Sequence, residues 1–483
     1  MKLKLFSTLF AAALGIAGQA MAAPTAYLPL GKHPVLEHQI DRMFAISTGT
    51  PMAKPYRIYD VQIALRQIKQ SNPDLHAQIL SGIQPYMSRD AVTRMGVKLR
   101  ADSGAEVKLA NDRSNSSSEY AEVSFDGIWR GGEHSLMQLG ADYRVEQGKL
   151  VAYNSFYALG GDNLQLNLGY KEHWFSPFKT FAQVYSNNAQ APLSVSLGLN
   201  APLKNWWNFD FELFYSKLEH VEKGILYQGT LHSGTPKLAG THLSIEPIDG
   251  WKIGVNRMMQ FGGGPRKVSI KDVFKAYFDP AGNDNYGLTG SRDTELGDQW
   301  ATLTSTYRSH WLTPIEWFFE YGGEDTKNHK NYQVGNTVAS FGVFIPSLLE
   351  KATLRYEYTN MHSLWYVNHI YDSYGNTINS SVVGHFAADK RLFNDGAPSQ
   401  IHSLETTYFS SPSELWSLKY SMIDNTSEYL NELGELGGKY ETSHELQIIN
   451  NRAYDDKRLE TTLTLGKDVF GENYTWLAVN VYW

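Results

Sequence analysis

Side chains suited to binding sugars gather in one short stretch of the second half of the chain. Within residues 361–399 they are His362, Trp365, Tyr366, Asn368, His369, Tyr371, Asp372 and Tyr374. Sugar rings present apolar C–H faces and polar hydroxyls, so a protein that binds them combines aromatic platforms with planar hydrogen-bonding groups. This mixture therefore predicts contacts to a polysaccharide.

A second stretch, residues 262–298, repeats the mixture with Tyr277, Asp284, Asn285, Tyr286 and Arg292. These two stretches and a third, residues 424–440, are rich in Gly, Asn, Asp and Tyr, and connections longer than about 15 residues are commonly functional. The alternative role for the aromatic residues is anchoring at a membrane interface, where barrels concentrate Trp and Tyr.

The elements that would position these loops alternate in polarity from about Thr93 onward. Leu164, Leu166 and Leu168, for example, alternate with polar Gln165 and Asn167. This period of two is typical of strands with one lipid-facing side and one lumenal side. It predicts an all-β transmembrane barrel of about 18 antiparallel strands over residues 92–483, with inward charges such as Arg355 and Glu357 in a watery or densely paired lumen.

The last strand supports this interpretation. Leu477, Val479, Val481 and Trp483 lie on one side of it, and nothing follows to cover them. In a soluble sheet that stripe and the open edge would face water, whereas a closed barrel places the stripe against lipid and pairs the edge with the first strand. The alternative is the terminal strand of a soluble β-sandwich.

The N-terminus predicts export. Lys2 and Lys4 precede an apolar stretch and then Ala20-Met21-Ala22, which is typical of a removable signal peptide over residues 1–22. No later stretch of 18 or more apolar residues occurs, and the chain has no cysteine to carry a lipid anchor. These features predict a protein of the bacterial outer membrane.

Residues 23–91 have helical rather than strand periodicity. The apolar positions are Leu36, Ile40, Met43, Phe44, Val61, Leu65, Ile68, Leu75, Ile79 and Ile83. Three short amphipathic helices fit, with Asn72 capping the third and Pro73 at its first position. We expect a small periplasmic α-helical bundle at the barrel mouth, the alternative being a flexible soluble extension.

One external loop also contains a helical pattern. Ile270, Val273, Phe274 and either Tyr277 or Phe278 share one face over residues 269–278. We expect a helix there, acting either as an ordered lid or as packing material at the barrel rim.

Charge and spacing exclude some ligands. The net charge is −7 without basic clusters, which is typical of a poor nucleic-acid binder. The acidic loop residues Asp279, Asp284, Asp293 and Asp298 match no calcium-loop spacing, so we expect neither a metal nor a cofactor.

Basic residues predicted near the rim could pair with lipopolysaccharide phosphates: Arg266, Lys267, Lys390 and Arg391.

Several short peptides, in this order, resemble the capsule assembly Wzi family. They are Gly49-Thr50-Pro51, Leu168-Gly169-Tyr170-Lys171-Glu172-His173-Trp174-Phe175-Ser176-Pro177, Asn256-Arg257-Met258-Met259-Gln260-Phe261-Gly262-Gly263 and Gly297-Asp298-Gln299. The resemblance implies an outer-membrane barrel of 18 strands, a periplasmic helical bundle and an external surface that acts as a lectin for capsular polysaccharide.

Three functions remain open at this point. We favour a monomeric, non-enzymatic lectin that retains capsular or extracellular polysaccharide, with a porin or uptake channel as the alternative, because a barrel of this size is wide enough for a pore. An enzyme is the third, since His232-Ser233, His362-Ser363 and His402-Ser403 supply bases and nucleophiles. Neighbouring residues in a strand point to opposite faces, which argues against these pairs.

Overall fold

The computed structural model describes residues 23–161, 163–281, 292–310, 313–324, 326–328, 330–371, 376–392, 395–426 and 438–483. The predicted signal peptide lies outside these residues. Within them, no helix is long and apolar enough to cross a bilayer.

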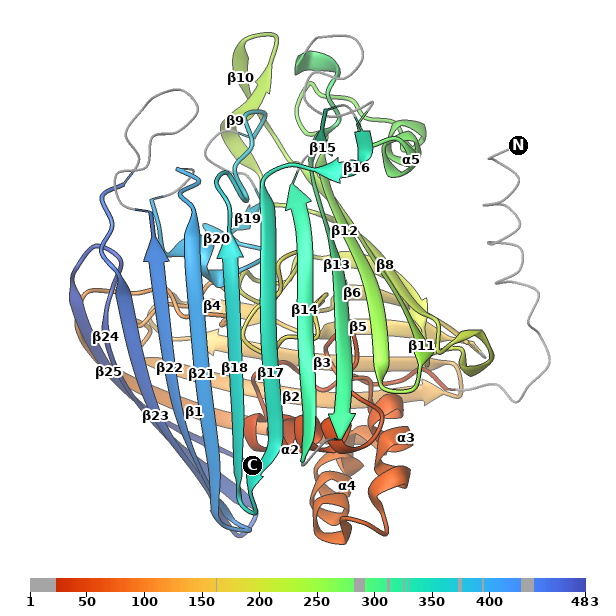
Figure 1. Ribbon diagram of the computed structural model, residues 1–483, viewed down its shortest axis with the longest axis vertical. Coiled ribbons are helices and arrows are strands. Elements are labelled where there is room, and N and C mark those ends of the chain that lie inside the picture. The colour runs from red at the N-terminus through yellow and green to blue at the C-terminus, as the bar shows by residue number, and fades with distance from the viewer. Residues whose placement is uncertain are drawn as a thin grey trace.

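A single closed antiparallel sheet forms the wall of the molecule (Figure 1). Its strands are β1 (Asp90–Gly104), β2 (Ala121–Gly132), β3 (Ser135–Arg144), β4 (Lys149–Ala152), β5 (Ser155–Gly160), β6 (Leu164–Tyr170), β7 (Ser194–Leu199), β8 (Asp210–Lys217), β11 (Lys237–Ile248), β12 (Trp251–Phe261), β13 (Gly297–His310), β14 (Pro314–Glu324), β17 (Thr337–Leu349), β18 (Ala352–Met361), β21 (Ser399–Ser411), β22 (Glu414–Asn425), β23 (Ser443–Tyr454), β24 (Lys457–Lys467) and β25 (Asn473–Tyr482). Because β4 and β5 both pair with β3 and are separated only by Tyr153 and Asn154, they form one wall strand, which gives the predicted 18.

The barrel closes where the last strand pairs with the first. Val481 lies opposite Val97, and Val479 lies opposite Leu99. Leu477 and Trp483 are exposed on the outer face, as the alternating pattern predicted. Closure gives each wall strand a hydrogen-bonded neighbour on both sides, which is the condition for spanning a bilayer with strands.

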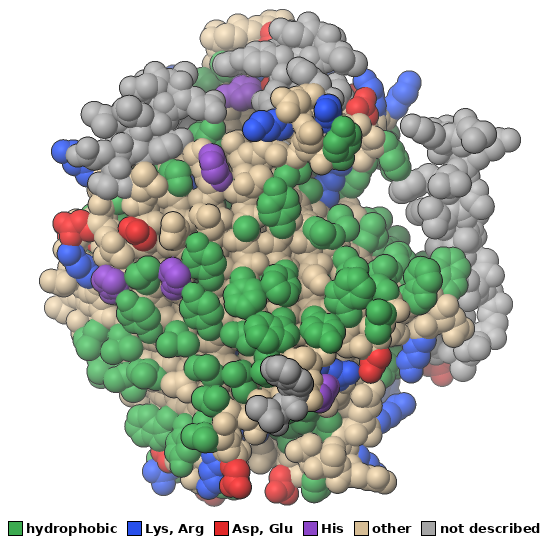
Figure 2. Space-filling view, viewed as in Figure 1, with side chains coloured by type: hydrophobic (Ala, Val, Ile, Leu, Met, Phe, Trp, Pro, Cys, Tyr) green, Lys and Arg blue, Asp and Glu red, His purple; other side chains and the backbone are tan. Residues whose placement is uncertain are grey.

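The two faces of the wall differ in chemistry. Figure 2 shows apolar side chains spread across the middle of the outer surface, with charged side chains concentrated near the two ends. One row of this lipid-facing belt consists of Leu243, Val255 and Leu303, which are opposite one another on β11, β12 and β13. Buried Asn256 and Thr302 point from the same strands to the lumen. The wall therefore has the surface of a transmembrane barrel.

Three helices occupy the end of the barrel at which the chain terminates (Figure 1). They are α2 (Pro34–Ile46), α3 (Ile58–Ile68) and α4 (Pro73–Met87). α2 packs against β14 and β17, and the helices bury Ile40, Val61 and Ile79 completely in a shared core. The expected helices and the Pro73 start are confirmed. Asn72 precedes α4, but its side chain makes no capping hydrogen bond, contrary to expectation.

The opposite end carries the long connections. It holds the hairpins β9 (Val221–Tyr227) with β10 (Thr230–Gly234), β15 (Thr326–Lys327) with β16 (Lys330–Val334) and β19 (Thr377–Ile378) with β20 (Ser381–Val382), the helix α5 (Ile270–Phe278), and the short helices η3 (Arg292–Thr294) and η4 (Phe386–Asp389). A further short helix, η1 (Lys204–Trp206), joins β7 to β8. The helix predicted over residues 269–278 is confirmed as α5, which starts with a reciprocal cap between Ser269 and Asp272.

The connection between β6 and β7 fills the lumen, which the sequence did not predict. This inner segment, residues 171–193, is buried at every position from 171 to 189 except half-buried Lys179. It pairs through Trp174 with Lys54 of the N-terminal segment, with N–O distances of 2.8 and 2.9 Å. On its other side the Ser186 amide donates to the Val383 carbonyl at 2.8 Å. The inner segment thus joins the helices to the external loops.

Two charged residues of β18 hold these lumenal parts together. Arg355 pairs with Asp41 of α2 at 3.1 Å and with Glu357 at 3.4 Å. The Glu357 carboxylate accepts the backbone amides of Lys179 and Thr180 at 2.9 and 2.8 Å. The inward Arg355 and Glu357 predicted from the sequence are therefore paired inside the protein rather than exposed to an open pore.

Arg355→Met should lower the free energy of unfolding by about 3–5 kcal/mol, because it leaves Asp41 and Glu357 buried without their counter-charge. Urea unfolding of the refolded protein in detergent measures this loss. Exposed Arg452→Met is the matched control and should cost less than about 1 kcal/mol. Equal effects of the two substitutions would contradict the role given to Arg355.

Candidate functional site

The aromatic residues expected to meet sugar in residues 361–399 are mainly inside the protein. Trp365 and Tyr371 are fully buried and Tyr366 is 4% exposed. The Trp365 indole donates to the Asn336 carbonyl, and the Tyr366 hydroxyl donates to the Gln183 carbonyl at 2.6 Å. The Tyr371 hydroxyl donates to the Gly262 carbonyl at 3.1 Å. In this structure their rings pack the loop into the barrel rather than offer a face to a ligand.

The other expected contacts are divided between surface and interior. Buried Asn368 accepts the Ile370 amide at 2.7 Å, which fixes a turn. His362 is exposed, and Tyr277 is half-buried beside the Arg257 guanidinium, 5.2 Å from its ring. The remaining predicted contacts lie outside the described residues: Asp284, Asn285, Tyr286, Asp372, Tyr374 and the Arg292 side chain.

Three external loops meet at one place, which we call the loop junction. It consists of the β9–β10 hairpin, residues 292–296 before β13, and residues 366–371 after β18. The Leu226 amide donates to the Ile370 carbonyl at 2.8 Å, and the Gln228 amide donates to the Asp293 carboxylate at 2.7 Å. A ring nitrogen of His369 lies 2.9 Å from the Glu295 carboxylate. The junction is therefore a built surface rather than three independent loops.

The side chain of Arg266 links two of the loops in this junction. Its guanidinium donates to the carbonyls of Leu226 at 2.8 Å and Glu295 at 3.1 Å, and it lies 5.8 Å from the Tyr227 ring. Tyr227 also meets His232 edge to face at 6.3 Å. Exposed Gln228 and Thr230 lie in the same hairpin.

This arrangement combines ring faces, planar amides, imidazoles and carboxylates on one external surface, which is the chemistry expected of a sugar-binding site. Tyr227, Gln228 and His232 were not predicted from the sequence. Their hairpin is shorter than the three long connections rich in Gly, Asn, Asp and Tyr, and no local pattern shows which loops meet in space.

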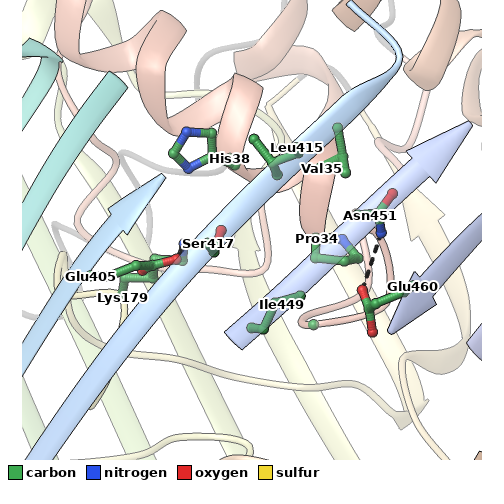
Figure 3. Close-up of a pocket in the computed structure, with 11 residues that line it drawn as sticks. Pro34, Val35, His38, Lys179, Glu405, Leu415, Ser417, Ile449, Asn451 and Glu460 are labelled. Atoms are coloured by element: carbon green, nitrogen blue, oxygen red, sulfur yellow. Dashed lines mark hydrogen bonds and ion pairs between the residues drawn. The ribbon is translucent and has the colours of Figure 1, made fainter. Parts of the chain in front are cut away.

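A cavity of about 160 Å³ lies within the barrel, between α2 and the strands β21 to β24 (Figure 3). Pro34, Val35, Leu415 and Ile449 form its apolar lining, and the Lys179–Glu405 ion pair of 3.1 Å lies at one side. Burial lowers the pKa of His38, also at the cavity, to about 3, so its ring is neutral. Ligand pockets usually measure about 300–1,000 Å³, so this space suits waters rather than a sugar chain.

Three of the basic residues predicted to pair with lipid phosphates have protein partners instead. Besides Arg266, buried Arg391 donates to the Ala397 carbonyl at 2.7 Å and to the Trp365 carbonyl. The Lys390 ammonium donates to the Lys108 carbonyl. Only Lys267 of the four is exposed. Arg266 and Arg391 thus stabilise loops.

A family model described as capsule assembly protein Wzi matches residues 87–390, which is more than half of the chain. The chain belongs to the Wzi capsule assembly family. The match runs from the end of α4 through η4, so it includes both the inner segment and the loop junction. Membership and the barrel fold place the protein in an outer membrane.

A solved structure agrees with this fold. A Wzi from Escherichia coli, described as an outer-membrane protein involved in group 1 capsule assembly and as a carbohydrate-binding β-barrel, is 13% identical; the match covers 95% of this chain and 99% of that one, with a TM-score of 0.70. OccAB4 of Acinetobacter baumannii is 12% identical over 82% of this chain and 98% of its own, with a TM-score of 0.46. OpdQ of Pseudomonas aeruginosa is 9% identical over 81% of this chain and 96% of its own, with a TM-score of 0.45. No curated protein sequence matches the chain.

The lumen of this Wzi-family barrel is filled from both ends. α2 packs inside the periplasmic mouth, and the inner segment and residues 377–388 occupy the external half. The buried Phe178 ring packs against Phe181 at 4.6 Å and against Phe318 of β14 at 5.6 Å, so the inner segment is packed against the wall. A hydrated ion would have to cross this region, which opposes steady conductance.

Planar-bilayer recording tests this closure. The full-length protein should pass no steady current, whereas replacement of residues 173–190 by a short Gly-Ser linker should open a stable channel. The same linker in place of residues 222–233, in the external hairpin, is the matched control and should stay silent. Steady current through the unmodified protein would contradict the closure.

Proposed function

We propose that this protein is a non-enzymatic, lectin-like protein of the outer membrane that retains capsular or extracellular polysaccharide at the cell surface. The loop junction is the observation that carries the proposal, because it joins three external loops into one surface with sugar-binding chemistry. The relative of known structure that shares the fold is described as carbohydrate-binding, which supports the same class of ligand.

The proposed contacts are Tyr227, Gln228 and His232 of the hairpin, with exposed His369 beside them, whose ring lies against the buried Glu295 carboxylate. His362, Asp284, Asn285, Tyr286, Arg292, Asp372 and Tyr374 remain proposed contacts by their position in the same two loops. An aromatic side chain contributes about 1 kcal/mol to such a contact. Single sites are therefore weak, and a long polymer that touches many copies gains its retention from avidity.

The filled lumen favours retention over transport as the role of this protein. A channel needs a continuous water-filled path, whereas the inner segment is buried at almost every position from 171 to 189. A channel is therefore the alternative function, and a steady current in planar bilayers would support it.

The proposal also treats the protein as non-catalytic. The Ser363 hydroxyl and His362 ring lie 3.0 Å apart in the loop after β18, so this pair does meet, outside regular β structure. In the described part of the chain, no hydrogen bond joins His362 to a carboxylate that could orient it as a base.

Retention of labelled polysaccharide by cells tests the function directly. In a strain with intact polymer synthesis, loss of this protein should move polymer from the cell surface into the medium while total polymer stays constant. Reintroduction of the gene should restore the original distribution. An unchanged distribution in the cells that lack the protein would remove the lectin proposal.

The double substitution Tyr227→Ala with His232→Ala tests the loop junction. Each lost contact should weaken single-site binding about fivefold, and avidity should enlarge the effect on polymer retained by cells. Exposed Tyr59→Ala, on the periplasmic helix α3, is the matched control and should retain polymer normally. Normal retention by a folded double variant would exclude the junction as the binding surface.

A further inference from the structure

Helix α5 packs on the outer face of the barrel, the face that turns toward lipid. Arg257 of β12 donates to the carbonyls of Ala276 and Tyr277 at 3.0 Å each, and thereby binds the last turn of the helix. The Tyr277 hydroxyl bonds to Thr241 of β11. Fully buried Ala276 shares an apolar cluster with Met259 of β12. The helix is thus fixed to the wall by polar and apolar contacts.

The strand register shows how near the helix lies to the lipid-facing belt. Thr241, Arg257 and Ala301 form one row across β11, β12 and β13. A second row consists of Leu243, Val255 and Leu303. It lies two residues further along the same strands and on the same face, and its side chains are 40–52% exposed. Two residues of a strand span about 7 Å. The end of α5 is therefore attached at the upper boundary of the belt.

One exposed side of α5, next to the side that contacts the wall, is apolar. Ile270, Phe274 and Phe278 follow one another at intervals of four residues and are 77%, 48% and 63% exposed. At 100° per residue they form a stripe next to the wall contacts of Val273 and Tyr277. The apolar surface of the belt thus continues onto the helix.

Lysines accompany this stripe. Lys271 and Lys275 are exposed one turn apart on α5, beside the stripe, and Lys267 is exposed in the residues that precede the helix. Figure 2 shows blue and green side chains close together near the upper end of this view. A helix with phenylalanines on one side and lysines beside them is typical of helices that lie in a membrane interface.

We propose that α5 is an interfacial anchor that inserts Ile270, Phe274 and Phe278 into the outer leaflet, while its Lys271 and Lys275, together with Lys267 just before the helix, pair with the phosphates of a phosphorylated glycolipid. Lipid is favoured over polymer as the occupant because the stripe is continuous with the belt and the lysines complement phosphate charge. This inference goes beyond the proposed retention of polysaccharide, and neither depends on the other.

Spin labels test the insertion. Because the chain has no cysteine, Phe274→Cys creates a single labelling position in the full-length protein. In vesicles of phosphatidylcholine with lipid A, oxygen should relax this label more than a water-soluble nickel complex does, as for a label at Val255→Cys in the belt. A label at Glu222→Cys, in the exposed hairpin, gives the aqueous reference. A Phe274→Cys label as accessible to nickel as this reference would overturn the insertion.

Substitution of the lysines tests the phosphate pairing. Lys267→Gln, Lys271→Gln and Lys275→Gln together should weaken binding of lipid A to the detergent-solubilised protein at least tenfold, since each lysine near a phosphate surface contributes about fivefold. A triple control with the same charge change lies at the other end of the barrel: Lys69→Gln, Lys204→Gln and Lys351→Gln. A loss smaller than tenfold, or an equal loss in the control, would overturn the pairing.

The two proposals fail separately in these experiments. The α5 lysine variant should retain polysaccharide on cells while it loses lipid A. The Tyr227→Ala, His232→Ala variant should bind lipid A normally while it loses polymer.

Discussion

The structure depends on one constraint, that no backbone amide or carbonyl of a spanning strand can face lipid without a partner. Pairing of β25 with β1 meets it and fixes the wall at 18 strands. A wall of that circumference encloses more space than its own inward side chains can fill. The chain fills the remainder with α2, the inner segment and the turned-in external loops, so the same closure that satisfies the backbone creates the need for a packed lumen.

Charge pairing decides how the lumen is filled. An inward strand face carries polar and ionised groups, which are costly to bury unless each finds a partner. Arg355 and Glu357 find theirs on α2 and on the inner segment, and Lys32 pairs with Asp142 of β3 at 2.6 Å. These contacts join segments that are distant in sequence, so the helices and loops are parts of the barrel interior rather than separate attachments.

The sequence predicted those features that depend on local periodicity: the wall strands, the closing strand, the three helices and α5. It did not predict that residues 171–193 enter the lumen, although Phe175, Phe178 and Phe181 within a connection were a signal that the connection is buried. Trp365 and Tyr366 have the residue types of sugar platforms, yet their orientation depends on contacts with Asn336 and Gln183. The loop junction depends on which loops meet, and this is a property of the assembled barrel.

The pairing of Val97 with Val481 has a consequence for how the protein is made. β1 and β25 are separated by more than 350 residues of sequence, so the seam cannot form until β25 has been exported. Folding that awaits such distant contacts is slow, and both edge strands stay open to wrong pairing meanwhile. A chain without β25 would keep most of its residues yet have no closed state, so completion of the barrel depends on this one strand.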